Sequence, residues 1–155
     1  KHRRRQRQMC IRDSNNIGSI FRTCDAFLVS KIYLCGITAQ PPNRKINKTA
    51  LGSTESVEWE YFKSTKKIIE KLKSKGVKIW SIEQVENAKK LHQIEEIDKG
   101  IEHAVVFGNE IKGVSQEIID ISNNTIEIDQ YGTKHSLNVT VAAGIVVWKF
   151  YNSLN

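Results

Sequence analysis

The chain has 155 residues, of which 39% are hydrophobic and 26% are charged. This length suits one domain, and the composition excludes a wholly disordered or fibrous protein. The formal net charge of +7 is typical of proteins with a polyanionic partner, but residues 1–14 carry +5 of it and the remainder only +2. The longest apolar stretch, residues 139–150, is too short to cross a bilayer, so we expect no membrane partner.

The chain opens with the basic run KHRRRQRQ, which contains no apolar residue. Such a run favours a solvated tail, with an arm on nucleic-acid phosphates as the alternative. The string MCIRDS at residues 9–14 resembles a translated sequencing adapter. We therefore expect residues 1–14 to be a basic segment that is not native to the protein, and residues 15–155 to form a single domain.

A helix is predicted over residues 15–28, where apolar residues recur along one stripe. Arg22 falls off that stripe, one turn after Gly18, whose missing side chain lets a ligand or another backbone come close. A strand follows over residues 31–35. Residues 36–49 are rich in turn formers and are predicted to be a long functional or mobile loop.

The rest of the chain alternates short strands and helices, which predicts an α/β fold with a mostly parallel sheet flanked by helices. The predicted strands are residues 57–62 (a short edge strand), 77–82, 103–107 and 125–128, and the predicted helices are 64–76, 87–97, 115–121 and 136–151. The last helix is apolar nearly all round, so it must be buried. In so short a chain, this predicts a helix that two subunits share.

Polar and small residues stand at the ends of several predicted elements. Asn16 and Gly18 begin the first helix, and Phe107-Gly108-Asn109-Glu110, with Gly113 after it, follows a buried strand. Ligands of open α/β sheets bind at the carboxyl ends of the strands, although a plain strand-to-helix turn explains the second segment equally well. A third polar segment, residues 132–138, leads into the last helix, where Ser136 or Asn138 can cap the N-terminus.

Three cysteines without a CxxC pair give no disulfide framework and no zinc site, and they favour a reducing cytoplasm. Cys24 and Cys35 are expected to be small buried apolar residues. No spacing of His and carboxylate residues predicts a metal or a Ser-His-Asp triad. The residues alone therefore predict an α/β domain with a small-molecule site built from loops.

Three segments, in order, resemble the motifs of the SpoU (TrmH-type) family of the SPOUT superfamily of RNA methyltransferases. They are NNIGSIFRTCDAF, VVFGNEIKGVS and IEIDQYGTKHSLNVTVAAGIVVW. The resemblance covers about residues 11–151. It implies a SPOUT methyltransferase fold with a deep C-terminal trefoil knot, a homodimer formed through the C-terminal helix, and 2′-O-methylation of tRNA or rRNA ribose with S-adenosylmethionine.

The resemblance also implies roles for individual residues. Asn16 and Arg22 would lie by the reacting ribose, with Glu110 beside Arg22 and with Ser136 and Asn138 at the junction of cofactor and substrate. The residues implied in cofactor binding are Ile82, Glu83, Phe107, Gly108, Asn109, Gly113, Ile128, Ser136, Leu137 and Asn138. Arg22 and the basic residues of the long loop, Arg44, Lys45 and Lys48, are candidates for RNA contacts.

Arginine stays protonated in proteins, so two roles remain open for Arg22: the base that the family's mechanism invokes, or an anchor for the adjacent phosphate. This sequence departs from the family pattern at Asp129-Gln130, where Pro-Met is usual, and before the first motif, where we expect the first strand to be missing. A non-catalytic RNA-binding or ribosome-assembly protein is the alternative function, and a methyltransferase for a small molecule is a more distant one.

Overall fold

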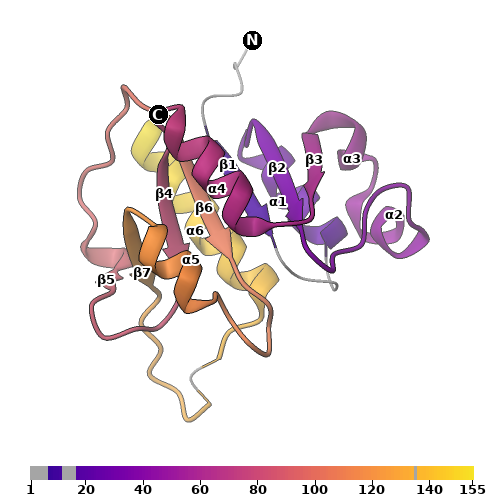
Figure 1. Ribbon diagram of the computed structural model, residues 1–155. Helices are drawn as coiled ribbons and strands as arrows, with labels where there is room; N and C mark the ends of the chain where they lie inside the picture. Colours follow the sequence, from indigo (N-terminus) through magenta and orange to yellow (C-terminus); the bar gives the residue numbers. More distant parts are fainter. Residues whose placement is uncertain (1–6, 12–16, 135) are drawn as a thin grey trace.

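The computed structural model describes residues 7–11, 17–134 and 136–155. Its strands are β1 (Arg7–Ile11), β2 (Lys31–Cys35), β3 (Glu58–Phe62), β4 (Lys78–Ile82), β5 (Lys89–Lys90), β6 (His103–Phe107) and β7 (Asn124–Glu127). Its α-helices are α1 (Ile17–Ala26), α2 (Arg44–Ala50), α3 (Ser53–Ser56), α4 (Thr65–Ser74), α5 (Gln116–Ile121) and α6 (Val139–Leu154). The strands form one sheet in the order β3-β2-β1-β6-β4-β7-β5, and each pair of neighbours is parallel (Figure 1).

Helices cover both faces of this sheet, which confirms the predicted α/β class. The apolar stripes of α1, α2 and α6 pack with Met9, Trp80 and Val105 in one core. The stripes of α4 and α5 pack with Tyr33 and Ile79 in a second core on the other face. Every residue of β6 is buried because parallel strands in the middle of such a sheet are covered on both sides. The knot that the resemblance implies stays a prediction.

The expectation that the first strand is missing is wrong. Residues 7–11 form β1, which lies between β2 and β6 in the middle of the sheet. Met9, Cys10 and Ile11 are completely buried, so three apolar residues suffice for a short central strand whose neighbours supply the hydrogen bonds. Whether residues 1–14 are native to the protein stays a prediction. Cys24 and Cys35 are buried as expected.

Residues 36–49 are not a continuous loop as predicted, because α2 begins at Arg44. The Asn43 side chain caps this helix by accepting hydrogen bonds from the backbone N–H groups of Lys45 and Ile46, at 2.9 and 3.3 Å. Ile46 packs toward Gly18 of α1, where a Cβ atom would lie 2.3 Å from the Ile46 carbonyl oxygen. Gly18 thus admits another backbone.

The predicted helix over residues 87–97 is also wrong. This segment forms the two-residue strand β5 and a single 3₁₀ turn, Leu91–Gln93, before it continues without regular structure. Leu91, Ile94 and Ile97 are buried. Their spacing of three imitates the apolar stripe of a helix, but the pairing of β5 with β7 holds the chain extended at Lys89 and Lys90.

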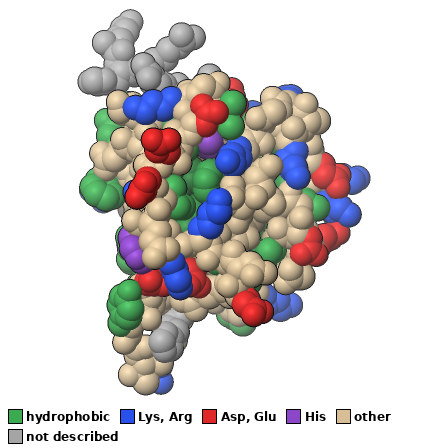
Figure 2. Space-filling model, turned by 90° about the vertical axis from the view of Figure 1, so that its left-hand side faces the viewer, with side chains coloured by type: hydrophobic (Ala, Val, Ile, Leu, Met, Phe, Trp, Pro, Cys, Tyr) green, Lys and Arg blue, Asp and Glu red, His purple; other side chains and the backbone are tan. Residues whose placement is uncertain are grey.

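The last helix, predicted over residues 136–151, runs from Val139 to Leu154. One face packs into the core, but Val141, Ile145 and Trp148 on the other are 51%, 38% and 55% exposed. The single chain therefore does not bury this helix on all sides. Among the described residues, no helix is both long and apolar enough to cross a membrane. Figure 2 shows acidic and basic side chains interspersed on one face. This agrees with the sequence, in which residues 15–155 carry a net charge of only +2.

His103 connects β6 to β4 and α6 in the core. The Trp80 indole N–H donates a hydrogen bond to His103 Nδ1 at 3.1 Å, so the proton of the neutral ring is on Nε2, which lies 2.6 Å from the Asp98 carbonyl oxygen. The Phe150 ring packs on both side chains. Burial lowers the pKa of His103 from its usual 6.5, because it disfavours the charged ring.

We expect the free energy of unfolding to fall as the pH decreases below about 6.5. The unfolded chain then binds a proton at His103 that the folded protein excludes, and the loss levels off below the folded pKa. Urea unfolding between pH 8 and about pH 5 measures this slope. The His103→Gln variant should lose it, whereas the exposed His92→Gln variant should keep it. An equal slope in both variants would contradict the role of His103.

Candidate functional site

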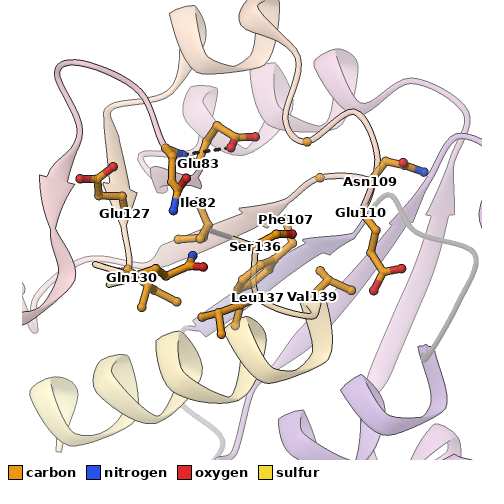
Figure 3. Close-up of a pocket in the computed structure, with 15 residues that line it drawn as sticks. Ile82, Glu83, Phe107, Asn109, Glu110, Glu127, Gln130, Ser136, Leu137 and Val139 are labelled. Carbon is orange, nitrogen blue, oxygen red and sulfur yellow. Dashed lines mark hydrogen bonds between the residues drawn. The ribbon is translucent and has the colours of Figure 1, made fainter. Parts of the chain in front are cut away.

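A pocket opens at the carboxyl ends of three adjacent strands, β6, β4 and β7, and the start of α6 closes its lower side (Figure 3). It is lined by Ile82, Glu83, Gln84, Phe107, Gly108, Asn109, Glu110, Gly113, Glu127, Ile128, Gln130, Ser136, Leu137, Val139 and Ala142. The end of a parallel sheet is the ordinary ligand position in this class, since strand termini there expose backbone groups. The structure therefore brings together every predicted cofactor residue except Asn138.

A tight turn over residues 109–113 forms one wall of the pocket. Asn109 and Gly113 exchange two backbone hydrogen bonds, and the Asn109 side chain accepts further bonds from the N–H groups of Ile111 and Lys112. A Cβ atom at Gly108 would lie 2.1 Å from the Gly113 carbonyl carbon. The turn can therefore fold back onto the end of β6 only with glycine at these positions. The sequence alone did not decide whether this segment is a plain turn or part of a ligand site.

Glu83 holds this turn against β4. Its carboxylate accepts hydrogen bonds from the backbone N–H groups of Val114, at 2.9 Å, and Gln84, at 3.0 Å. One carboxylate oxygen would lie 2.0 Å from a Cβ atom at Gly113, so only glycine admits it there. Each of the two oxygens of Glu83 thus accepts a backbone hydrogen bond, which makes the residue part of the pocket wall.

Replacing Glu83 by alanine is expected to loosen the turn, because the N–H of Val114 loses its acceptor. The cost should be about 1–3 kcal/mol in the free energy of unfolding. Urea unfolding measures this loss, and hydrogen exchange should show faster exchange at Val114. The Glu83→Gln variant keeps one acceptor oxygen, so its free energy of unfolding should lie between those of the wild type and Glu83→Ala. The Glu86→Ala variant, at an exposed position, serves as the control. Unchanged exchange at Val114 in Glu83→Ala would argue against the clamp.

Asn138 connects the pocket to a second groove. Its side-chain oxygen caps α6 by accepting from the Thr140 N–H at 2.8 Å, and its amide nitrogen donates to Glu110 Oε1 at 3.3 Å. The Asn138 side chain therefore caps the helix and contacts Glu110 at the same time. The groove beyond it is lined by Ile17, Gly18, Ala39, Asn43, Arg44, Lys45, Ile46, Thr49, Glu110 and Asn138. Glu110 thus borders both cavities.

Some predicted residues lie outside these cavities. Arg22 is exposed on α1 and lines neither of them, and Lys48 is exposed on α2 without lining the groove. Asn16 lies outside the described residues. The roles proposed for Arg22, Asn16 and Lys48 stay predictions.

Five pocket residues were not predicted: Gln84, Glu127, Gln130, Val139 and Ala142. Gln84 and Gln130 follow predicted strands, so their position at a carboxyl end was a usable signal. Val139 and Ala142 lie three residues apart in the first turn of α6, where their apolar character was assigned to the core alone. Turn-forming residues in the sequence therefore predicted the ends of the strands better than they predicted which side chains line the pocket.

The pocket lining fits a nucleoside cofactor such as S-adenosylmethionine. Ile82, Phe107 and Leu137 offer apolar surface for a flat ring, and Gly108 leaves the backbone of the rim accessible. The Glu110 carboxylate at the mouth suits a cationic group. Within the described part of the chain, no group of His, Cys, Asp and Glu side chains has the arrangement of a metal site.

The parallel sheet with a pocket at its carboxyl edge places this chain in the class of α/β proteins that bind a ligand at the ends of their strands. A model of the SpoU rRNA methylase family matches residues 9–148. The chain therefore belongs to the SpoU rRNA methylase family.

Among its relatives is the tRNA (guanosine(18)-2′-O)-methyltransferase of Aquifex aeolicus, 34% identical over 146 residues that cover 90% of this chain and 64% of that protein. The 23S rRNA (guanosine(2553)-2′-O)-methyltransferase of Bacillus subtilis is 29% identical over 138 residues, which cover 89% of this chain and 54% of the relative. The chain thus spans less than two thirds of the length of either relative.

Solved structures share the fold. The A. aeolicus TrmH/SpoU tRNA modifying enzyme superposes with a TM-score of 0.82 at 28% identity, over 97% of this chain and 77% of that chain. The AdoMet-bound rRNA methyltransferase from Sinorhizobium meliloti superposes with a TM-score of 0.86 at 23% identity, over 99% and 59% of the two chains.

Proposed function

We propose that this chain transfers a methyl group from S-adenosylmethionine to a ribose 2′-hydroxyl of tRNA or rRNA. The observation that carries the proposal is the Glu110–Asn138 hydrogen bond, which lies between the pocket at the strand ends and a groove with basic residues. A methyl transfer to RNA needs such a pair of neighbouring sites, one for each substrate. The named relatives, which act on guanosine 2′-oxygens of tRNA and rRNA, support the same reaction.

The cofactor, when bound, supplies an activated methyl group on its sulfonium, so the protein contributes orientation and electrostatics. Backbone groups of Gly108, Ile128, Ser136 and Leu137 would hold it, with Ile82 and Phe107 against its ring. Asn109 and Gly113 would contribute through the turn that they close. The pocket lining supports these assignments.

The RNA would lie in the second groove, with its phosphates on Arg44 and Lys45. Arg22 and Asn16 would act at the reacting ribose, where the 2′-hydroxyl must lose its proton as it attacks the methyl carbon in line. A guanidinium that holds the adjacent phosphate also stabilises the developing negative charge on that oxygen.

We infer that the active form is a homodimer joined through α6. Val141, Ile145 and Trp148 are spaced i, i+4 and i+7, so they form one exposed apolar stripe along the helix. A second copy that packs on this stripe would complete the burial of the helix. We propose a cytoplasmic location, because the proposed substrates, tRNA and rRNA, occur there.

Calorimetry with S-adenosylmethionine tests the cofactor assignment, and mapping 2′-O-methyl sites in RNA from cells with and without the gene tests the reaction. We expect saturable binding and the loss of a defined 2′-O-methyl mark when the gene is absent. A folded dimer that does not bind S-adenosylmethionine would overturn the proposal in favour of a non-catalytic RNA-binding or ribosome-assembly protein.

A further inference from the structure

An ionic cluster at the edge of the sheet, which we call the Lys90 clasp, ties β5 to the segment after β7. Lys90 lies opposite Glu127 in the register of these strands, and its ammonium contacts Glu127 Oε1 and lies 2.7 Å from Asp129 Oδ1. The Tyr131 hydroxyl donates a hydrogen bond to Asp129 Oδ2 at 3.2 Å, and His92 Nδ1 lies 3.8 Å from that oxygen. One ammonium thus holds two carboxylates, with two further side chains around the second.

The clasp holds a segment that also forms a wall of the proposed cofactor pocket. Ile128 and Gln130 alternate along the chain with the two acidic residues of the clasp, and both line the pocket. Figure 3 shows the Glu127 side chain turned away from the pocket centre, while Gln130 lies beside Leu137 at the start of α6. Through Glu127, which also lines the pocket, and Asp129, which does not, Lys90 therefore restrains this wall.

Partial burial makes the loss of one partner of this contact more costly than in an exposed surface ion pair. The side chains of Glu127 and Asp129 are only 16% and 21% exposed, and that of Lys90 is 36% exposed. The hydrogen bond from Lys90 is the main cause that lowers the pKa of Asp129. Without the ammonium, two partly buried carboxylates would repel each other on the same segment.

We propose that Lys90 is a positioning residue for the cofactor pocket: by holding Glu127 and Asp129 on one ammonium, it keeps Ile128 and Gln130 in place against the ligand. The identity of that ligand rests on the proposed function.

The test compares Lys90→Met with Lys89→Met. Lys89 is exposed on the same strand and forms no ion pair with any described residue, so both variants remove one charge from β5 but only one removes the clasp.

Calorimetry would use two probes, S-adenosylmethionine and S-adenosylhomocysteine, which differ by the methyl group and its positive charge. We expect Lys90→Met to raise both Kd values by a similar factor, about five- to twentyfold. Lys89→Met should stay within about twofold of the wild type, and Lys90→Arg should restore affinity.

Hydrogen exchange provides a readout without any ligand. Segment 128–134 should exchange faster in Lys90→Met than in the wild type or Lys89→Met. Equal exchange in all three proteins, or a change in the Kd of S-adenosylmethionine alone, overturns the positioning role, since the latter marks a direct effect of charge on the cofactor. Wild-type protein that binds neither probe overturns the proposed function instead, and the exchange of segment 128–134 still decides whether the clasp restrains this wall.

Discussion

Arg22→Ala is expected to lower the rate of methyl transfer by at least about 100-fold and to leave the affinity for S-adenosylmethionine within about twofold of the wild type. Arg22 is exposed on α1 and does not line the proposed cofactor pocket. Its loss should therefore remove charge stabilisation at the ribose without altering the pocket. Single-turnover transfer of labelled methyl groups, with RNA isolated from cells that lack the gene, measures the rate, and calorimetry measures the affinity.

Two further variants make the result interpretable. Arg22→Lys keeps the charge but loses the planar fork that contacts phosphate in two places, so an intermediate rate would support the anchoring role. Lys75→Ala removes an exposed charge beside the C-terminal end of α4, on the opposite face of the sheet from α1, and should retain the wild-type rate. If Arg22→Ala instead loses cofactor binding, its assigned place at the ribose is wrong.

The second large effect is expected at the exposed stripe of α6. Trp148→Asp should weaken the proposed dimer by about 30-fold or more, because tryptophan at the centre of an interface contributes strongly and a buried carboxylate there has no partner. Trp148 is 55% exposed in the single chain, so the fold should tolerate the change. Sedimentation analysis over a range of concentrations measures the dissociation, and circular dichroism monitors the fold.

Leu51→Asp is the matched control for that experiment. Leu51 is another exposed apolar residue, at 67%, and its backbone φ of 52° lies in the left-handed region that aspartate tolerates. This variant should remain as dimeric as the wild type. A Trp148→Asp protein that sediments as the wild type does would exclude α6 as the subunit interface.

Much of the proposed site followed from local sequence signals. Gly108 and Gly113 mark the chain reversal after a buried strand, and Asn138 stands where a helix cap belongs. These residues act on neighbours a few positions away, so their spacing carries the information. The register of β5 against β7 depends on residues far apart in the chain, so the sequence does not predict the Lys90 contacts and wrongly predicts a helix over residues 87–97.

Strand β1 is a second element that its own residues did not predict. Its basic composition argued against a strand, yet Met9 and Ile11 are buried because β2 and β6 lie on both sides of it. Strand preference depends on the surroundings that a segment meets in the sheet, so a short strand is difficult to recognise from its own residues. The N-cap at Asn43 was a local signal for α2 that the turn-rich composition before it concealed.

The hydrophobic periodicity and the motifs were therefore sufficient for the parallel α/β architecture, the family and the strand ends that carry the pocket, because each of these depends on patterns within short stretches of chain. The tertiary structure was needed for the contact of Asn138 with Glu110, 28 residues apart, for the two carboxylates held by Lys90, and for the face of α6 that stays exposed. These features depend on which distant side chains meet once the sheet has formed, and spacing along the chain does not encode that directly.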